Sequence, residues 1–134
     1  MATAKNTDRL QWPVLTGAWS GLPTHAALLR GTNVYIIDSI NVVDANNAAY
    51  TSIPGTTNRV YLKAEAITFT LTPQGSMTPA AAKQILDDVF DGTHSFTVRL
   101  FSGVAAPTPS DLVTNRITGG GYADLSVTAF TTAE

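Results

Sequence analysis

The clearest pattern of hydrophobic and polar positions runs from Met77 to Phe101. In its first half the apolar residues recur at helical spacing and therefore share one face. Thr78 is a good N-cap, Pro79 suits the first helical position, and Gly92 is a natural stop. These signals predict one amphipathic helix over about residues 79–91. Its apolar face consists of Ala82, Ile85, Leu86, Val89 and Phe90.

From Ser95 onward the pattern changes to a period of two residues, which is the period of a strand. Phe96, Val98 and Leu100 point to one side, and the residues between them are polar. The sequence thus predicts a half-buried strand packed beside the helix. We expect one main hydrophobic cluster, formed by Ile67, Phe69, Ile85, Leu86, Val89, Phe90, Val98 and Leu100.

Much of the remaining chain shows short β-type runs, rich in β-branched residues and separated by Gly, Pro and Asn. The runs cover residues 25–30, 33–38, 40–44, 59–63, 65–71 and 122–130, with a brief run at 112–117 and a tail at 131–134. Pro107 and Pro109 indicate an exposed connection rather than a central strand. The pattern predicts a mainly β protein, an antiparallel β-sandwich or open barrel of about six to eight short strands carrying the one helix.

Residues 1–22 show no sustained periodicity, although they contain both tryptophans, Trp12 and Trp19. We therefore predict an extended N-terminal arm over 1–22, followed by a single β-rich domain over 23–134. The tryptophans admit two interpretations. They either fold back onto the core of their own domain, or they anchor the arm on a neighbouring subunit, since aromatic residues are enriched at interface centres.

The composition narrows the class of protein. A chain of 134 residues corresponds to one domain, and with no cysteine it has neither disulfides nor thiol nucleophiles. The net charge of −2 gives no electrostatic footprint for nucleic acid, and the sequence contains neither an apolar run long enough to span a membrane nor an ordinary secretory signal. Charged residues make up 13%, about half the usual share. This indicates either a Thr-rich β protein or a subunit whose faces are covered in an assembly, where unpaired charge is costly.

Residue types that could carry chemistry are sparse. His25 and His94 lie far apart in the sequence, and each suits a strand or turn better than a catalytic base. Asp38 and Asp44 could form an acid–base pair, but nothing around them indicates a cleft. We therefore expect no catalytic, cofactor or metal site, and no enzymatic activity.

Three aspartates follow the polar side of the predicted helix to its C-terminal end, where the helix dipole disfavours negative charge. We weigh three explanations for this placement: a solvated face, a contact with basic residues of a neighbour, and a weak cation site. The residues are Asp87, Asp88 and Asp91.

The second half of the chain carries a recognisable series of short motifs. A Thr-capped helix ends in a Gly-Thr step, a strand ends in Leu-Phe-Ser, and a Pro-containing loop leads to Gly-Gly-Tyr-Ala and a Val-Thr strand. The residues are Thr78, Ile85-Leu86, Phe90-Asp91-Gly92-Thr93, Val98-Arg99-Leu100-Phe101-Ser102, Pro107, Pro109, Gly120-Gly121-Tyr122-Ala123 and Val127-Thr128. Over residues 77–130 this series resembles a family of small structural proteins of tailed-bacteriophage virions. The family usually has Arg after Gly-Gly-Tyr-Ala, where this chain has Asp124.

The resemblance implies a non-enzymatic structural subunit of a virion, assembled in the host cytoplasm. We expect a capsid decoration or cement protein, with a tail, neck or tail-fibre component as the alternative within that class. The expected partners are the major capsid protein or tail proteins and further copies of the chain, without nucleic acid or membrane. A host-carbohydrate-binding module, stacking sugars on Trp12, Trp19 or tyrosines, is a separate alternative. The candidate subunit contacts are Trp12, Trp19, Arg9, Arg99 and Tyr122.

Overall fold

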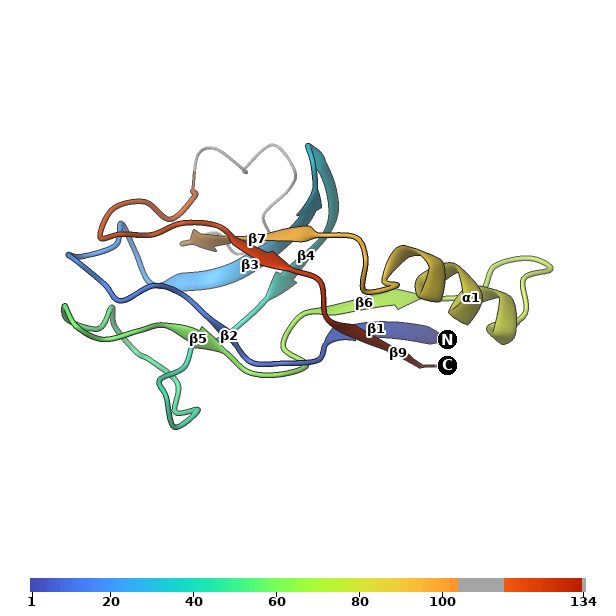
Figure 1. Ribbon diagram of the computed structural model, residues 1–134, viewed down its shortest axis with the longest axis horizontal. Helices are drawn as coiled ribbons and strands as arrows, with labels where there is room; N and C mark the ends of the chain where they lie inside the picture. The colour runs from blue at the N-terminus through green and yellow to red at the C-terminus, as the bar shows by residue number, and fades with distance from the viewer. Residues whose placement is uncertain (104–114, 134) are drawn as a thin grey trace.

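The computed structural model describes residues 1–103 and 115–133 and shows a mainly β protein with one helix (Figure 1). The strands form three antiparallel sheets, of four, three and two strands. The predicted fold class is therefore confirmed, although the described part contains nine strands rather than six to eight. The strands are β1 (Ala2–Asn6), β2 (Leu10–Gln11), β3 (Pro23–Arg30), β4 (Asn33–Ser39), β5 (Tyr61–Leu62), β6 (Thr68–Leu71), β7 (Phe96–Ser102), β8 (Leu125–Val127) and β9 (Phe130–Ala133), and the helix is α1 (Pro79–Val89).

The four-stranded sheet has the order β4-β3-β7-β8, and β3 at its centre is buried on both faces. A short, nearly continuous apolar run is typical of such a strand. Leu28 pairs with Val98 of β7 and faces the main core. Ala27 and Leu29 face the other way and form a second small cluster with Phe101.

The three-stranded sheet has the order β6-β1-β9, so the N-terminal strand lies in its middle (Figure 1). Ala4 pairs with Phe69 on one side and with Thr132 on the other. The prediction of an extended arm over 1–22 is therefore wrong at its first strand, and so is the prediction of a tail over 131–134. Each of these segments is short, so neither shows periodicity by itself, and each gains its backbone hydrogen bonds only from a distant partner.

The side-chain amide of Asn6 fixes β1 between its neighbouring segments. Its side chain is fully buried, yet each of its polar atoms has a partner. The Oδ1 atom accepts the backbone N–H of Ile67 at 2.9 Å, while Nδ2 donates to the carbonyl oxygens of Asp8 at 2.8 Å and Lys63 at 3.1 Å. Since a buried amide without partners is costly, this residue specifies the path of three chain segments at once.

The remainder of the predicted arm also belongs to the domain. Trp12 is fully buried and Trp19 is 4% exposed, both within the main hydrophobic cluster. The backbone N–H of Trp12 donates to the carbonyl of Val60 at 3.0 Å, beside the β2–β5 pair. Of the two interpretations of the tryptophans, the structure shows the one in which they fold onto their own core.

Helix α1 packs against β1, β6 and β9, and its cap is as predicted. The Oγ1 atom of Thr78 accepts the N–H of Ala81 at 3.1 Å. The helix ends at Val89, two residues earlier than predicted, with Phe90 as its C-cap. Ala82 and Leu86 face the sheet, where Ala2 and Ala4 offer small side chains for close approach.

The predicted core is largely confirmed, with one error. Phe90 is 5% exposed and stacks on Phe96, with ring centroids 4.9 Å apart, and it also contacts Phe69 and Phe130. Ile85 instead is 43% exposed, because the sheet beneath the helix covers only the Ala82–Leu86 side of the apolar face. The other predicted members are buried or packed at the edge of the cluster: Ile67, Phe69, Leu86, Val89, Val98 and Leu100.

Several predicted strand boundaries differ from the structure. The 40–44 run forms no strand, and Val43 makes only isolated bridges to Ala49 and Tyr61. The runs at 59–63 and 65–71 shorten to β5 and β6, and the last run divides into β8 and β9. The predicted Pro107–Pro109 connection and most of the 112–117 run lie outside the described residues.

The glycine triplet at 119–121 lies against the segment 16–20. The N–H of Thr16 donates to the carbonyl of Gly120 at 3.1 Å, and Gly120 has φ +48°. A Cβ atom built there would lie 2.3 Å from the carbonyl oxygen of Gly17. Only glycine permits both this conformation and this approach.

We expect Phe90→Ala to lower the free energy of unfolding by about 3–5 kcal/mol, because it leaves a cavity among aromatic rings. Ile85→Ala, on the same helix, should cost about 1 kcal/mol or less, since its side chain is largely exposed. Urea unfolding of the two variants checks the helix orientation, which equal losses would contradict.

We expect Gly120→Ala to destabilise the protein more than Gly31→Ala does. Both glycines have positive φ, of +48° and +62°, so both variants share the backbone strain. Gly31 has no atom within 4 Å of the added methyl group, whereas Gly120 has the Gly17 carbonyl. The difference should reach about 1–3 kcal/mol in thermal or urea unfolding. Equal losses of stability in the two variants would mean that the 16–20 segment moves away from the added methyl group at no cost in free energy.

Candidate functional site

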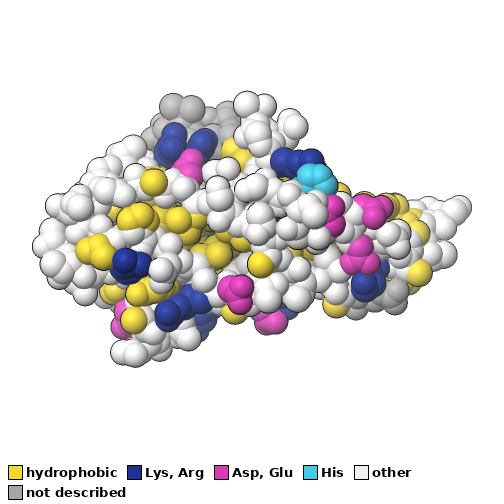
Figure 2. Space-filling model, viewed as in Figure 1, with side chains coloured by type: hydrophobic (Ala, Val, Ile, Leu, Met, Phe, Trp, Pro, Cys, Tyr) yellow, Lys and Arg dark blue, Asp and Glu magenta, His cyan; other side chains and the backbone are white. Residues whose placement is uncertain are grey.

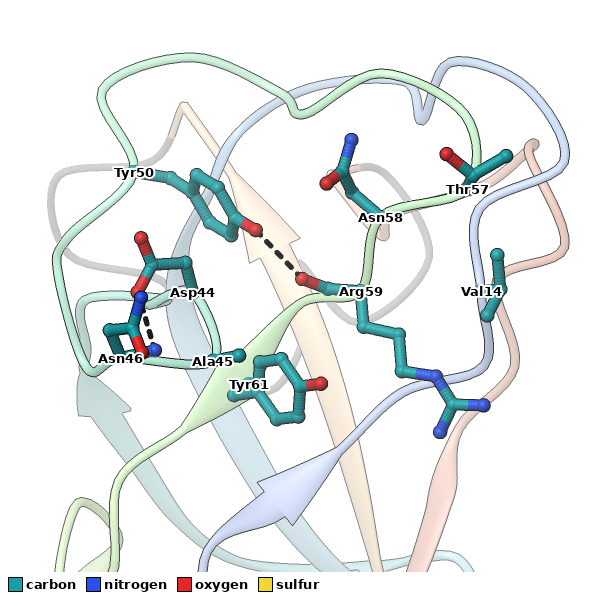
Figure 3. A pocket seen from close by; sticks show the side chains of 9 residues that line it. All are labelled: Val14, Asp44, Ala45, Asn46, Tyr50, Thr57, Asn58, Arg59 and Tyr61. Atoms are coloured by element: carbon teal, nitrogen blue, oxygen red, sulfur yellow. Dashed lines mark hydrogen bonds between the residues drawn. The ribbon is translucent and has the colours of Figure 1, made fainter.

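An open hollow between two loop segments is the candidate site (Figure 3). It has a volume of about 450 Å³. One wall comes from the 44–50 loop and the other from the 57–61 segment, with Val14 completing the second wall. The lining residues are Val14, Asp44, Ala45, Asn46, Tyr50, Thr57, Asn58, Arg59 and Tyr61.

Asp44 shapes the first wall. Its Oδ1 atom accepts the backbone N–H groups of Asn46 at 2.8 Å and Ala48 at 3.0 Å, and its own N–H donates to the carbonyl of Ala48 at 2.9 Å. Asn47 takes a positive φ of 63°, which Asn tolerates better than most residues. The loop therefore has a defined turn rather than an arbitrary path.

The second wall is tied to the first by backbone and side-chain bonds. Tyr61 belongs to β5, and its N–H and carbonyl exchange hydrogen bonds with Val43 at 3.0 and 2.9 Å. The hydroxyl of Tyr50 donates to the carbonyl of Arg59 at 2.9 Å, a bond drawn in Figure 3. Thr57 has φ +72°, a strained value for a β-branched residue.

The charged residues of the hollow are Asp44 and Arg59 in its lining and Arg9 beside it. The Arg9 guanidinium lies over the Tyr61 ring, 4.3 Å from its centroid, and donates to the carbonyl of Ala45 at 2.8 Å. Arg59 forms no side-chain hydrogen bond or ion pair with the described residues. Burial raises the pKa of Tyr50, and the negative charge of the Asp44 carboxylate raises it further.

These groups suit the binding of a polar ligand. Phenol rings offer apolar faces for stacking, guanidinium groups recognise carboxylates in a forked geometry, and the Asn and Thr side chains add hydrogen-bonding groups. A second hollow, of about 530 Å³, also borders the 43–49 loop, where Lys63 and Glu65 line it. It contains no aromatic residue, so it offers no stacking surface.

A second polar cluster lies around Asp124. Its Oδ2 atom accepts from Nε of Arg99 at 3.0 Å and from an Nη atom of Arg116 at 3.1 Å. The Tyr122 hydroxyl donates to Oδ1 of Asp124 at 2.8 Å and accepts the backbone N–H of Leu100 at 2.9 Å. Burial raises the pKa of Tyr122 well above its ordinary value, so this hydroxyl keeps its proton. The cluster joins β7 to the segments around 116 and 122–124.

The predicted contact residues lie in three places. Arg99 and Tyr122 meet at Asp124, and Trp19 packs edge-on against Tyr122, with centroids 5.2 Å apart. Arg9 lies at the hollow, and Trp12 is enclosed in the core. Since both tryptophans are buried in the chain itself, neither offers its ring to a neighbour or to a sugar.

Sequence reasoning missed the hollow itself. Tyr50, Arg59 and Tyr61 looked like ordinary loop and strand residues, and none belongs to a motif. The available signal was weak: two tyrosines and an arginine flank a Thr-rich loop that contains a Pro-Gly turn. Their convergence depends on the bridge of Val43 to Tyr61, which no local pattern reveals.

The acidic residues near the helix end have local partners. Asp87 pairs with Lys83 at 2.8 Å and accepts from Thr132, and hydrogen bonds from these two side chains lower its pKa. Asp91 caps the turn after the helix, and its hydrogen bonds, first from the Thr93 backbone N–H, lower its pKa to about 2. Asp88 accepts from Gln84 at 3.1 Å. These solvent-exposed carboxylates thus form hydrogen bonds and ion pairs with neighbouring groups of the same chain.

The remaining candidate chemistry is dispersed. Asp38 accepts the N–H of Thr68 at 2.9 Å, whereas Asp44 accepts N–H groups of its own loop, and burial raises the pKa of Asp38. His25 contacts Thr24, and His94 contacts Asp91. Across residues 1–103 and 115–133, no three acidic or histidine side chains come together as metal ligands. Within the same residues, no helix has the length and apolar character needed to cross a membrane.

We expect Tyr122→Phe to lower the free energy of unfolding by about 1–3 kcal/mol, because the Leu100 N–H and Asp124 would each lose a buried partner. Tyr35→Phe is the matched control, since the Tyr35 hydroxyl has no hydrogen bond among the described residues. That control should change stability by no more than about 0.5 kcal/mol in urea unfolding. Equal losses of stability in the two variants would show that the hydrogen bonds of the Tyr122 hydroxyl to the Asp124 cluster do not stabilise the protein.

Comparison with known proteins leaves the chain unassigned: no protein-family model, no curated protein and no solved structure matches it.

Proposed function

We propose that this protein is a non-enzymatic structural subunit of a tailed-bacteriophage virion, and within that class a capsid decoration or cement protein. The observation that carries the proposal is the series of motifs over residues 77–130, which resembles such a family. The proposed location is the virion, assembled in the host cytoplasm. The proposed partners are the major capsid protein and further copies of the chain.

The motif residues support the proposal because they hold the framework of the fold. Thr78 caps α1, Gly92 takes φ +83° after it, and Leu100 is fully buried in β7. Gly120 makes the close approach to Gly17. The motif residues over about 50 positions thus cap the helix, form turns and fill the core. We therefore expect proteins that share these motifs to share this fold as well.

The position at which this chain departs from the family also fits the proposal. Asp124 stands where the family usually has Arg, but it is paired with Arg99 and Arg116. The Arg116 side chain is 40% exposed. A guanidinium is therefore present near the surface at this place. Arg99 remains a proposed contact residue through the same cluster.

The surface supports an assembled protein rather than an isolated one. Figure 2 shows hydrophobic side chains gathered across the half of the face that lies away from α1, while acidic side chains gather over the helix. Val14 at the hollow is more than one-third exposed, and so is Ile85 on α1. With charged residues at only 13% of the chain, such a surface can be covered at little desolvation cost.

Two alternatives remain open to experiment. A tail, neck or tail-fibre position would use the same framework with different partners, and nothing in the motifs distinguishes it from a capsid position. A host-carbohydrate-binding module would use stacking platforms, and the tyrosines of the hollow rather than the buried tryptophans would supply them.

The proposal predicts that the gene lies in the genome of a tailed phage, and it is tested on purified particles of that phage. We expect mass spectrometry to find the chain in the virion in many copies, and antibody labelling under the electron microscope to decorate the head. Labelling confined to the tail would favour the alternative location. Absence of the chain from intact particles would contradict the structural role altogether.

A further inference from the structure

We propose that the hollow between the 44–50 loop and the 57–61 segment binds an acidic saccharide, with Arg59 recognising a sugar carboxylate. This binding activity goes beyond the structural role proposed above and does not depend on it. The hollow of about 450 Å³ lies within the range of roughly 300–1,000 Å³ that small-molecule sites occupy.

The aromatic residues favour a sugar among polar ligands. Tyr50 and Tyr61 both line the hollow, and each is only partly buried, although Arg9 covers one face of the Tyr61 ring. A sugar ring has an apolar face of C–H groups and a rim of hydroxyls, which suits an aromatic ring beside hydrogen-bonding groups. Those groups are present in Asn46, Asn58 and Thr57. The amide of Asn58 already donates to the carbonyl of Gly55 at 3.1 Å, which leaves its oxygen free to accept from a hydroxyl.

The charges favour an acidic sugar over a neutral one. The Arg59 guanidinium lines the hollow without a carboxylate partner among the described residues. Arg9 adds a second positive charge beside Tyr61, although its position is fixed by the Ala45 carbonyl. Asp44 is the single acidic residue of the lining described, and two backbone N–H groups occupy its Oδ1 atom. A ligand carboxylate can therefore pair with Arg59, in the forked geometry that guanidinium groups prefer.

The site is held in shape before any ligand arrives. The Asp44 turn defines one wall, the Val43–Tyr61 bonds fix the other, and the Tyr50–Arg59 bond joins them. Arg9 adds a further link, because it contacts Tyr61 and Ala45 at once. Pre-organisation of this kind lowers the entropy cost of binding. Thr57 at the rim has a strained, positive φ. Strained backbone conformations of this kind cluster at functional sites, because they cost stability.

The test uses a tetrasaccharide of alternating glucuronic acid and N-acetylglucosamine as the acidic probe, and an N-acetylglucosamine tetramer as the neutral one. Binding is followed by NMR chemical-shift titration of the full chain at millimolar ligand. We expect the acidic probe to bind in the hollow and to shift the amides of the 44–50 and 57–61 segments. The neutral probe should bind at least about tenfold more weakly, because it cannot form the ion pair with Arg59.

Arg59→Gln removes the positive charge and keeps a shorter polar side chain, and we expect it to weaken binding of the acidic probe roughly 10- to 100-fold. Arg30→Gln removes an arginine outside the hollow and should leave binding unchanged. Added salt should weaken binding to the unaltered protein and to Arg30→Gln, but much less to Arg59→Gln. The amide spectrum of each variant reports whether it is folded.

Three results would overturn the proposal: no saturable shifts with the acidic probe, equal binding of the two probes, or unchanged binding in folded Arg59→Gln. Each result concerns the isolated protein, whereas the virion role is tested on particles. The two proposals can therefore fail separately.

Discussion

The central position of β1 between β6 and β9 is the constraint on which the rest of the structure depends. A middle strand has both edges hydrogen-bonded, so it brings residues near the start of the chain against residues near 70 and near 130. The buried Asn6 amide then joins the end of this strand to Ile67, Asp8 and Lys63. Once β1 is in place, its small side chains at Ala2 and Ala4 provide the surface on which α1 lies.

The two ends of the molecule have different physical characters. At one end α1 covers the three-stranded sheet, both chain termini lie beside it, and its acidic residues are paired within the chain (Figures 1 and 2). At the other end the β2–β5 pair and its loops form the hollow, where arginines and tyrosines meet. The framework motifs belong mainly to the first end and to the four-stranded sheet. The hollow lies outside the motif-bearing half of the chain. A binding activity located there would therefore not depend on the motif residues.

The Asp124 cluster illustrates how a carboxylate can be accommodated in a partly buried place. A carboxylate beside Arg99 and Arg116 receives a hydrogen bond from each, and the Tyr122 hydroxyl completes its partners. Tyr122 in turn satisfies the backbone N–H of Leu100 and packs against Trp19. Polar groups that are all satisfied can be partly buried without a large penalty. Asp124 thus attaches the segments around 116 and 122–124 to β7.

The sequence by itself determined the helix that begins at Pro79 with its Thr78 cap, the strand that begins at Phe96, and the mainly β class. Caps, period and turn residues act over neighbouring positions, so each of these could be predicted locally. Only the tertiary structure decided that residues 2–6 form a central strand, that both tryptophans are internal, and that Ile85 faces solvent. It alone also brought Tyr50, Arg59 and Tyr61 together. The physical reason is the same in each case. Local patterns show which residues prefer burial or extension, but backbone hydrogen bonds between distant segments select the partner, and the partner decides which face is covered.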